Sequence, residues 1–574
     1  MKYKLMNSGI HDNYVQNLLR ARGVEDYENI VHPTDECLQS WRFLDNIEKG
    51  VEVIKNTINS DTPYAIIMDC DMDGITSTTI IYDYLKKLNP NKKIECFIHS
   101  GKQHGFSDLM DELLGREWSL IIAPDSATND GKFIKQFNCP VLCADHHIYE
   151  EENEIPPNMI LINNQTSPRY KNKGLSGAGV TWQLCRALDD ELLHNYAADL
   201  IDLAATSIIA DMMPMTEAEN QYIVQEGIKP QNIKNEMLRV LFDKTSYSMG
   251  RKVTPIGIAF YIVPLINAMI RVGTMEEKRR LLDAFINPSK MVECHKRGAA
   301  GTMERVCIES ARECTNAKSH QDKMKEKACE SLEMKIFKND LLENEILFIE
   351  LDEEDIFPAT INGLVAMYFT SKYHKPTIVA RKGTDGYDKG SARAPSNTEL
   401  TSFKDYLLGT GLFDLAQGHD QAFGISLLEK NLDSLHEKAN NDLSKIDFGE
   451  SIYSVDFVRD AKDDYDISKI VEAMDSISYV FGQQLSEPFI AIKNIHLKNS
   501  NISIIGKNKD TIRFYVGDVC YIKFRAKDDI EKIQSIDDLR ITLVGKMAIN
   551  HWGNTDTPQI LITDWDIEDN RFSF

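Results

Sequence analysis

The chain has 574 residues, of which 42% are apolar and 27% charged, so a fibrous or wholly disordered protein is excluded. Its 65 Lys and Arg against 88 Asp and Glu leave a formal net charge of −23, which excludes a general binder of polyanions. If the protein binds nucleic acid, its positive charge must therefore be concentrated in one groove. The length predicts about three to five domains.

The cysteines and the apolar runs bear on where the protein works. Eleven cysteines are scattered along the chain, and this odd number without a compact spacing favours reduced thiols. Residues 1–23 lack the apolar core of a secretion signal, and no run approaches the ~20 apolar residues of a membrane span. We expect a cytoplasmic protein without a membrane partner.

The chain begins with a polar N-terminal arm, residues 1–50, that we expect to pack on the first domain. From residue 51 to 235, short apolar runs alternate with amphipathic segments of helical length. This alternation predicts an α/β domain with a mainly parallel sheet covered by helices on both faces. The runs of strand length are Tyr64–Met68, Ser119–Ala123, Val141–Ala144, Met159–Ile162 and Leu203–Ala210.

The rest of the chain divides into four stretches. Residues 236–340 have a helical pattern and predict a long helical connector, and residues 341–445 predict a second mixed α/β domain. A linker is expected at 446–487. Residues 488–574 carry short β-type runs with little helix, which predicts a barrel or sandwich of about five strands.

Acidic residues and histidines follow four of the predicted strands, each at the point where the strand ends. In an open parallel sheet the carboxyl ends of the strands meet at one edge, beside the point where strand order reverses. A single such Asp is usually a helix cap or a turn residue, but capping does not explain the whole set. The set comprises Asp69, Asp71, Asp73, Asp125, Asp145, His146, His147 and Asp211.

Such a cluster predicts a metal centre. Neighbouring carboxylates resist joint ionisation unless cations neutralise them. Carboxylate and imidazole ligands together suit two divalent ions, Mn²⁺ or else Mg²⁺. Two such ions roughly 3.5–4 Å apart commonly promote phosphodiester hydrolysis, which is the chemistry that the pattern favours.

Several segments, taken together, resemble the successive motifs of the DHH phosphoesterase superfamily, and specifically those of the RecJ exonucleases. The DHH motifs correspond to DCDMDGITS from Asp69, to Asp125, to ADHH ending at His147, and to IADMMPMTEAEN around Asp211. The RecJ arrangement is matched in order by PLINAMIR (264–271), KGSAR (389–393), QGHDQAFG (417–424), Phe481-Gly482 with Glu487-Pro488, and the segment from Val544 to Gln559.

The resemblance implies a DHH catalytic domain at 51–235, a DHH-associated substrate-binding domain at 341–445 and a nucleic-acid-binding OB-fold at 488–574. It implies that Asp71, Asp73, Asp125, His146 and Asp211 hold metal, with Asp125 bridging, while Asp69 is a ligand or lies just outside the ligands. His147 would lie beside the scissile phosphate. The implied substrate-binding residues are Asn267, Arg271, Ser391, Arg393, Gly418 and His419.

Three positions depart from the RecJ pattern. Ile270 stands where a Gly usually precedes the Arg, and Gln417 replaces the first Gly of its loop. In the segment GKQHGFS, Gly101 occupies the position of an Arg linked to recognition of the 5′ end, for which Lys102 or His104 would substitute. These departures leave the metal chemistry unaltered but affect end recognition, as in a divergent or phage-borne member.

Other candidate sites have simpler interpretations. Cys139, Cys143 and His146 have a zinc-like spacing, but core thiols are favoured, and Cys314 with His320 is expected on a solvated helix face. Trp552 and Trp565 are expected to pack. For the basic and aromatic residues of the last domain, base stacking and barrel core remain equally open. These are Arg513, Phe514, Tyr515, Tyr521, Lys523, Phe524 and Arg525.

The resemblance implies a metal-dependent 5′-to-3′ exonuclease that hydrolyses single-stranded DNA to mononucleotides in repair, recombination or replication. A narrow channel would exclude duplex DNA. We expect a monomer, with a single-strand DNA-binding protein as a further partner. Two alternatives are a DHH phosphoesterase for short oligoribonucleotides, against which the OB-fold argues, and a catalytically silent DNA-binding scaffold, against which the retained carboxylates argue.

Overall fold

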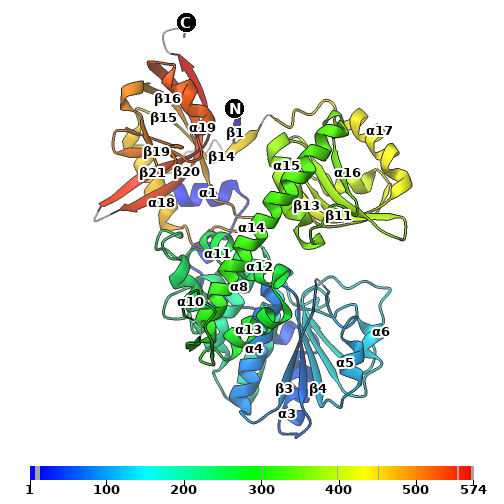
Figure 1. Cartoon of the computed structure of the whole chain (residues 1–574). Helices are drawn as coiled ribbons and strands as arrows, with labels where there is room; N and C mark the ends of the chain where they lie inside the picture. Colours follow the sequence, from blue (N-terminus) through cyan, green and yellow to red (C-terminus); the bar gives the residue numbers. More distant parts are fainter. Residues whose placement is uncertain are drawn as a thin grey trace. The chain divides into compact units, whose positions relative to one another are not determined.

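The computed structural model describes residues 1–6, 13–101, 103–299, 301–396, 398–449, 451–552 and 555–569 (Figure 1). The chain forms two compact units. The N-terminal unit comprises residues 13–318 and 473–487, and the C-terminal unit comprises residues 1–12, 319–472 and 488–574. Lys102, a candidate for recognition of the 5′ end, lies outside the described residues, as does the side chain of Trp552.

A five-stranded parallel sheet is the centre of the N-terminal unit, with the strand order β3-β2-β4-β5-β6. The chain leaves β2 for β3 on one side and then returns to place β4 on the other side, so strand order reverses between β2 and β4. The strands are β2 (Tyr64–Met68), β3 (Ile94–Ile98), β4 (Leu120–Pro124), β5 (Val141–Asp145) and β6 (Met159–Asn163).

Helices cover both faces of this sheet. Figure 1 shows α5 (Met110–Leu114) and α6 (Gly131–Ile134) on one side and α4 (Met72–Leu88) on the other. The α5 and α6 side packs around Phe106, Leu113 and Ile134, against alternate residues of the strands. On the opposite side lie α3 (Ile47–Thr57) and α7 (Gly177–Leu192), where a Cβ on Gly50 would contact Leu142, Ile162 and Leu184.

One predicted strand of this sheet was wrong, and one strand was missed. The run Leu203–Ala210 is not a strand but most of helix α8 (Ile201–Ala210), because a short, fully buried apolar run has no period that separates strand from helix. Its alanines favour the helix. The strand β3 was not expected, since this edge strand is partly exposed and carries Glu95, which interrupts the apolar run.

Before the connector, the N-terminal unit also has α1 (Tyr14–Ala21), α2 (Tyr27–Val31) and α9 (Ala218–Gly227). The helical character expected of residues 236–340 is confirmed by α10 (Glu236–Thr245), α11 (Pro255–Tyr261), α12 (Val263–Val272), α13 (Met275–Ile286) and α14 (Val306–Lys338). A short hairpin of β7 (Met291–Glu293) and β8 (Met303–Arg305) precedes α14, which continues into the C-terminal unit. Cys314, expected on a solvated face, is instead fully buried.

The C-terminal unit contains a mixed sheet with the order β12-β13-β11-β10-β9. Only β9 and β10 are parallel, and the other neighbours are antiparallel. The elements are β9 (Leu347–Leu351), α15 (Asn362–Tyr373), β10 (Thr377–Lys382), β11 (Tyr387–Arg393), α16 (Phe403–Gly409), β12 (Phe413–His419), β13 (Ala422–Leu428) and α17 (Leu432–Leu443).

A seven-stranded sheet follows, with the order β15-β16-β20-β21-β19-β18-β17. Its elements are β15 (Phe457–Asp460), α18 (Asp464–Ser476), β16 (Phe489–Lys498), β17 (Ser503–Ile505), β18 (Thr511–Val516), β19 (Val519–Lys523), α19 (Lys527–Gln534), β20 (Asp538–Trp552) and β21 (Thr555–Asp569). For the aromatic residues of this sheet, the sequence left base stacking and barrel core equally open, and the structure differs from residue to residue. Phe514 and Tyr521 are stacked and buried, whereas Tyr515 and Phe524 are exposed.

Two expectations about the ends of these regions need correction. Residues 13–50 of the N-terminal arm belong to the N-terminal unit as expected, but the first strand of the chain, β1 (Lys2–Leu5), pairs in parallel with β14 (Ile452–Val455) of the C-terminal unit. The stretch 446–487, expected as a linker, carries β14, β15 and α18. As expected, Trp565 is buried, and its indole N–H donates to Asp529.

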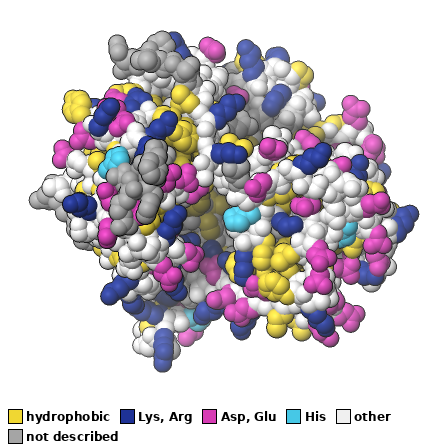
Figure 2. Space-filling view, turned by 90° about the horizontal axis from the view of Figure 1, so that it is seen from above, with side chains coloured by type: hydrophobic (Ala, Val, Ile, Leu, Met, Phe, Trp, Pro, Cys, Tyr) yellow, Lys and Arg dark blue, Asp and Glu magenta, His cyan; other side chains and the backbone are white. Residues whose placement is uncertain are grey.

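Charge is dispersed on the face drawn in Figure 2, where Lys and Arg side chains alternate with Asp and Glu. This face has no continuous basic stripe, in keeping with the net charge of −23.

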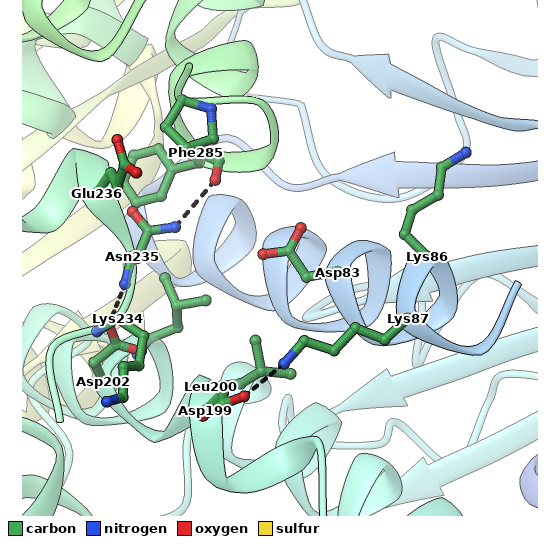
Figure 3. A pocket seen from close by; sticks show the side chains of 12 residues that line it. Asp83, Lys86, Lys87, Asp199, Leu200, Asp202, Lys234, Asn235, Glu236 and Phe285 are labelled. Atoms are coloured by element: carbon green, nitrogen blue, oxygen red, sulfur yellow. Dashed lines mark hydrogen bonds and ion pairs between the residues drawn. The ribbon is translucent and has the colours of Figure 1, made fainter. Parts of the chain in front are cut away.

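A cavity of about 560 Å³ lies between α4 and the start of α8 in the N-terminal unit (Figure 3). Its lining includes Asp83, whose carboxylate has no hydrogen-bond or ion-pair partner among the described residues. Burial and the charge of nearby Asp202 raise the pKa of Asp83 to about 7. Asp202 instead accepts from the backbone N–H groups of Lys234 and Asn235. Asp83 therefore costs folding energy when it is ionised.

Replacing Asp83 with Asn should stabilise the protein at pH 8. A carboxyl whose folded pKa lies above its unfolded value loses its contribution to stability as the pH rises from about 4 to about 7. The variant escapes this loss, so we expect a gain of about 1–2 kcal/mol at pH 8 and a smaller one at pH 5, measured by urea unfolding. Asp199→Asn is the control: it removes only an exposed ion pair with Lys87 and should change stability by less than about 0.5 kcal/mol. Equal effects of the two variants would contradict the assignment.

Candidate active site

The loop after β2 carries three carboxylates into the first turn of α4. Asp71 is the N-cap of this helix, and its side chain accepts from the Gly74 N–H at 3.0 Å. A Cβ on Gly74 would lie 2.5 Å from the carbonyl oxygen of Asp69, so a glycine is needed for the loop to turn this tightly. The loop therefore holds Asp69, Asp71 and Asp73 together at the strand-order reversal, where open α/β sheets bind ligands.

Asp73 is buried and held by the start of another helix. Its two carboxylate oxygens accept from the backbone N–H groups of Gly177 and Ala178, both at 2.8 Å, at the N-terminus of α7. The hydroxyl of Ser207 on α8 donates to the same carboxylate at 2.5 Å. The positive end of the α7 dipole favours this negative charge. Sequence reasoning missed these supporting groups; the Ser176-Gly177-Ala178-Gly179 run, typical of an N-cap and a close approach, was the available signal.

Asp125 follows β4 in a backbone conformation that side chains rarely adopt, with φ of 63°. Strain of this kind persists where the surroundings hold it and is common at functional sites. Its Oδ1 is buried and has no hydrogen-bond partner among the described residues. A Cβ on Gly177 would lie 2.3 Å from this oxygen, so the glycine leaves space for the carboxylate.

His146 lies where the carboxylates meet. Its Nε2 is 3.3 Å from Asp125 Oδ1, 3.5 Å from Asp211 Oδ2 and 3.8 Å from Asp73 Oδ2. Asp211 reaches this point as the C-cap of α8 and not, as expected, from the end of a strand. The structure thus brings three predicted carboxylates, each from a different segment, around the imidazole of His146.

The next residue, His147, is oriented by Asp145. The buried Asp145 carboxylate is 2.7 Å from His147 Nδ1 and accepts from the Thr128 N–H and hydroxyl. Burial opposes protonation of His147, but the bond to Asp145 and its negative charge outweigh burial and raise the pKa of His147 to about 10. This half-exposed imidazole is therefore positively charged at neutral pH.

Asp69 lies at the edge of the cluster beside His104 of the GKQHGFS segment. His104 Nδ1 is 2.8 Å from both oxygens of Asp69. This hydrogen bond is the main cause that raises the pKa of His104. Of the two residues expected to replace the missing Arg, His104 is thus beside the site, whereas Lys102 lies outside the described residues.

Burial and, after it, the crowding of like charges determine the electrostatics of the cluster. Burial, together with Asp69 and Asp73, raises the pKa of Asp71 to about 6, and burial with Asp73 and Asp71 raises that of Asp211 to about 8. Burial also raises the pKa of Asp125 far above its ordinary value and lowers that of His146. A neutral imidazole among carboxylates that resist ionisation is a donor set that divalent cations fit, because a cation would allow the carboxylates to ionise together.

Two predicted substrate-binding residues, Asn267 and Arg271, lie on α12 of the same unit. Burial lowers the pKa of Arg271, and the negative charge of Asp71 partly offsets this effect, so the guanidinium lies within electrostatic range of the carboxylate loop. The Oδ1 atom of Asn267 is buried without a hydrogen-bond partner among the described residues.

The other predicted substrate-binding residues lie at one end of three neighbouring strands, β11, β13 and β12, in the five-stranded sheet of the C-terminal unit. Arg393, Ala422 and His419 are in register across β11, β13 and β12. Ser391 is two residues before Arg393 and therefore shares its face. A Cβ on Gly363, near the start of α15, would lie 2.5 Å from Arg393 Nη2 and 3.6 Å from Ser391 Oγ.

The position of Gly418 in this region has no space for a side chain. Its φ is +136°, and a Cβ would lie 2.9 Å from Phe423 Cα on β13. In the row that joins Arg393 and His419, the residue between them is the small Ala422. A hydroxyl, a guanidinium and a helix start around a glycine form an arrangement that suits phosphate oxygens.

The zinc-like spacing of Cys139, Cys143 and His146 is not a site. Cys143 is buried within the apolar core of the sheet, and Cys139 packs against the same core. The interpretation of these residues as core thiols is therefore confirmed.

Family models match two parts of the chain. The model of the DHH family, N-terminal domain, matches residues 63–208, and the model of the RecJ OB domain matches residues 465–564. The second match begins before residue 488, where the sequence predicted the OB-fold to start.

Curated relatives match nearly the whole chain. YorK of Bacillus subtilis (strain 168), provisionally named an SPbeta prophage-derived single-strand DNA-specific exonuclease, is 31% identical over an alignment of 588 positions, which covers 99% of this chain and 98% of YorK. The single-stranded-DNA-specific exonuclease RecJ of the same organism is 26% identical, over 98% of this chain and 69% of its own length.

Among solved structures, RecJ from Thermus thermophilus in complex with Mn²⁺ has a TM-score of 0.70 at 16% identity, covering 96% of this chain and 76% of that one. This likeness confirms the fold class, with its parallel-sheet DHH domain, helical connector and OB domain. Because the DHH and RecJ OB domains occur in order and YorK aligns along nearly the entire length, the chain belongs to the RecJ family of single-stranded-DNA-specific exonucleases.

Proposed function

We propose that the chain is a divalent-metal-dependent exonuclease that degrades single-stranded DNA from its 5′ end to mononucleotides. The observation that carries the proposal is the convergence of Asp73, Asp125 and Asp211 on His146 Nε2, within 3.8 Å. RecJ relatives support the substrate, and one solved relative was determined with Mn²⁺ and another with Mg²⁺. The 5′-to-3′ direction and the mononucleotide product rest on the family resemblance.

Two divalent ions, Mn²⁺ or Mg²⁺, would be held by six residues that the cluster brings together. The resemblance gives Asp125 the place of the ligand shared by both ions, and its buried Oδ1, which has no hydrogen-bond partner among the described residues and lies 3.3 Å from His146 Nε2, would suit a cation ligand. When bound, such ions supply a nucleophilic water at neutral pH and stabilise charge on the phosphoryl oxygens. The six residues are Asp69, Asp71, Asp73, Asp125, His146 and Asp211.

Other residues of the chain would contact the phosphates of the substrate. His147, charged and fixed by Asp145, would donate a hydrogen bond to a non-bridging phosphate oxygen and stabilise the charge that develops there. Asn267 and Arg271 would hold the phosphate next to the cluster. Ser391, Arg393, Gly418 and His419 would bind further phosphates through a hydroxyl, a guanidinium, a backbone turn and an imidazole.

This function places the protein in DNA repair, recombination or replication in the cytoplasm, acting as a monomer on strands that a single-strand DNA-binding protein also covers. The two alternative functions have less support. A phosphoesterase for short oligoribonucleotides has no need of the OB domain, and a silent scaffold has no need of a strained Asp125.

The proposal is tested by digestion of single-stranded DNA labelled at the 5′ or the 3′ end. We expect immediate release of 5′-labelled mononucleotide with Mn²⁺, none with EDTA, and a loss of at least about 10³-fold in Asp125→Asn, because the bridging ligand is removed. Intact DNA that stays bound would favour the scaffold, and cleavage confined to short RNA would favour the small-substrate alternative.

A second prediction concerns stability without metal. Because the folded pKa of Asp211 is raised to about 8, the contribution of this carboxyl to stability is lost as the pH rises from about 4 to about 8. With EDTA present, Asp211→Asn should therefore be more stable than the wild type by about 1 kcal/mol at pH 8, with little difference at pH 4.

Asp73→Asn is the matched comparison for Asp211→Asn. It should lose stability, because an amide cannot accept well from two helix N–H groups and Ser207 together. Millimolar Mn²⁺ should raise the melting temperature of the wild type, but of neither variant. A wild type that Mn²⁺ does not stabilise would contradict the metal assignment.

A third prediction concerns the phosphate site of the C-terminal unit. Arg393→Lys keeps the charge but loses the planar fork, so we expect KM for single-stranded DNA to rise by roughly 5- to 20-fold with kcat little changed. Lys389→Arg, on the same strand but paired with Asp385 in solvent, should leave KM unchanged. A fall in kcat with unchanged KM would argue against a role in substrate binding.

A further inference from the structure

Helices α11 and α12 form an apolar stretch that the N-terminal unit covers only in part. Residues Pro255–Val272 are the one helical stretch among the described residues that is long and apolar enough to cross a membrane, a test that core helices of soluble proteins also pass. Only half of this stretch is buried. An apolar surface left open to solvent in this way commonly marks a binding surface.

The exposed part of the stretch ends in two aromatic rings. Phe260 is 67% exposed and Tyr261 is 43% exposed, whereas Ile258, Ile262 and Ile266 are buried. Apolar contacts within the unit are therefore made by the isoleucine side of the helix. The rings contribute little to the core, so packing does not explain them.

Phe260 lies on the same side of the helix as Arg271. The junction residue Ile262 keeps a right-handed helical conformation, and its N–H donates to the Ile258 carbonyl, so the helical period continues from α11 into α12. Eleven residues at about 100° each come to within about 20° of three full turns, and they span about 16 Å. Pro264 and Asn267 fall between the two on this side.

This helix side thus leads from the carboxylate cluster to an aromatic surface. Arg271 lies within electrostatic range of Asp71, and Asn267, about one turn before it on α12, has a buried Oδ1 without a hydrogen-bond partner among the described residues. Charged and polar groups at one end and rings at the other match a strand whose phosphates lie near the metal ligands and whose bases follow. Every base has a π face, so stacking on such rings does not depend on sequence.

We propose that Phe260, with Tyr261 beside it, is a base-stacking platform that holds single-stranded DNA some nucleotides away from the scissile phosphodiester. The inference rests on the proposed function and adds to it a specific contact. About 16 Å corresponds to about five stacked nucleotides at ~3.4 Å each, and to fewer where the strand is extended. The platform therefore acts on oligonucleotides and not on a dinucleotide.

The test compares a 5′-phosphorylated dT12 with pdTpdT. In Phe260→Ala, KM for dT12 should rise by roughly 5- to 100-fold, the loss expected for one stacked base, while kcat/KM for pdTpdT stays at the wild-type value. Because Phe260 is exposed, the variant should fold normally. Phe337→Ala, which removes a similarly exposed ring on α14 in the C-terminal unit, is the control and should leave both substrates unaffected.

Conservative variants separate stacking from simple apolar contact. Phe260→Trp should retain the affinity for dT12, whereas Phe260→Leu, which keeps apolar bulk without a π face, should behave like the Ala variant. Tryptophan fluorescence is measured in EDTA, where the strand stays intact. Adding dT12 should quench the fluorescence of Phe260→Trp more than that of the wild type, because of the added indole, whereas pdTpdT should cause no extra quenching.

Equal loss on both substrates, full activity of Phe260→Leu, or no added quenching would each overturn the platform. Failure of the proposed function would appear differently, because the wild type would then degrade neither substrate.

Discussion

The burial of several carboxylates at one point is the constraint on which the N-terminal unit depends. Asp71, Asp125 and Asp211 come from different segments, and their pKa values are raised first by burial and then by the negative charges of the neighbouring aspartates. With fixed dipoles, the fold offsets part of the cost of their ionisation. Asp73 accepts from two N–H groups at the start of α7, and Asp71 caps α4, so two helix N-termini point their positive ends at the cluster.

The same constraint accounts for the local sequence around the cluster. Gly74 lets the loop after β2 close on Asp69, and Gly177 leaves room for the Asp125 carboxylate. The strained backbone of Asp125 is tolerated because its N–H donates to the Ala144 carbonyl at 2.8 Å and the surrounding strands are fully buried. A rigid sheet edge thus holds acidic groups in positions that they would leave if the chain were free to relax.

Much of this arrangement could be predicted from the sequence, because apolar runs that end in Asp or His identify strand ends. Asp69, Asp125 and His146 follow β2, β4 and β5 as expected. Asp211 was predicted in the right place for the wrong reason, since α8 has no period that distinguishes it from a buried strand. The α7 N–H groups had a signal in the Ser176–Gly179 run, whereas Ser207 had none, because it contacts Asp73 only through the tertiary fold.

Charge placement connects the acidic composition with a polyanionic substrate. The chain as a whole has a net charge of −23, which creates no long-range attraction for DNA, and on the face drawn in Figure 2 basic and acidic side chains are interspersed. In the proposed function, attraction would come from a few cations: His147, bonded to Asp145, Arg271 within electrostatic range of Asp71, and Arg393 close to Gly363 near the start of α15. On this proposal two of these cations, His147 and Arg271, lie beside the carboxylate cluster, so the strand would be held next to the residues that would bind the metal, while the acidic remainder of the chain adds no attraction for it.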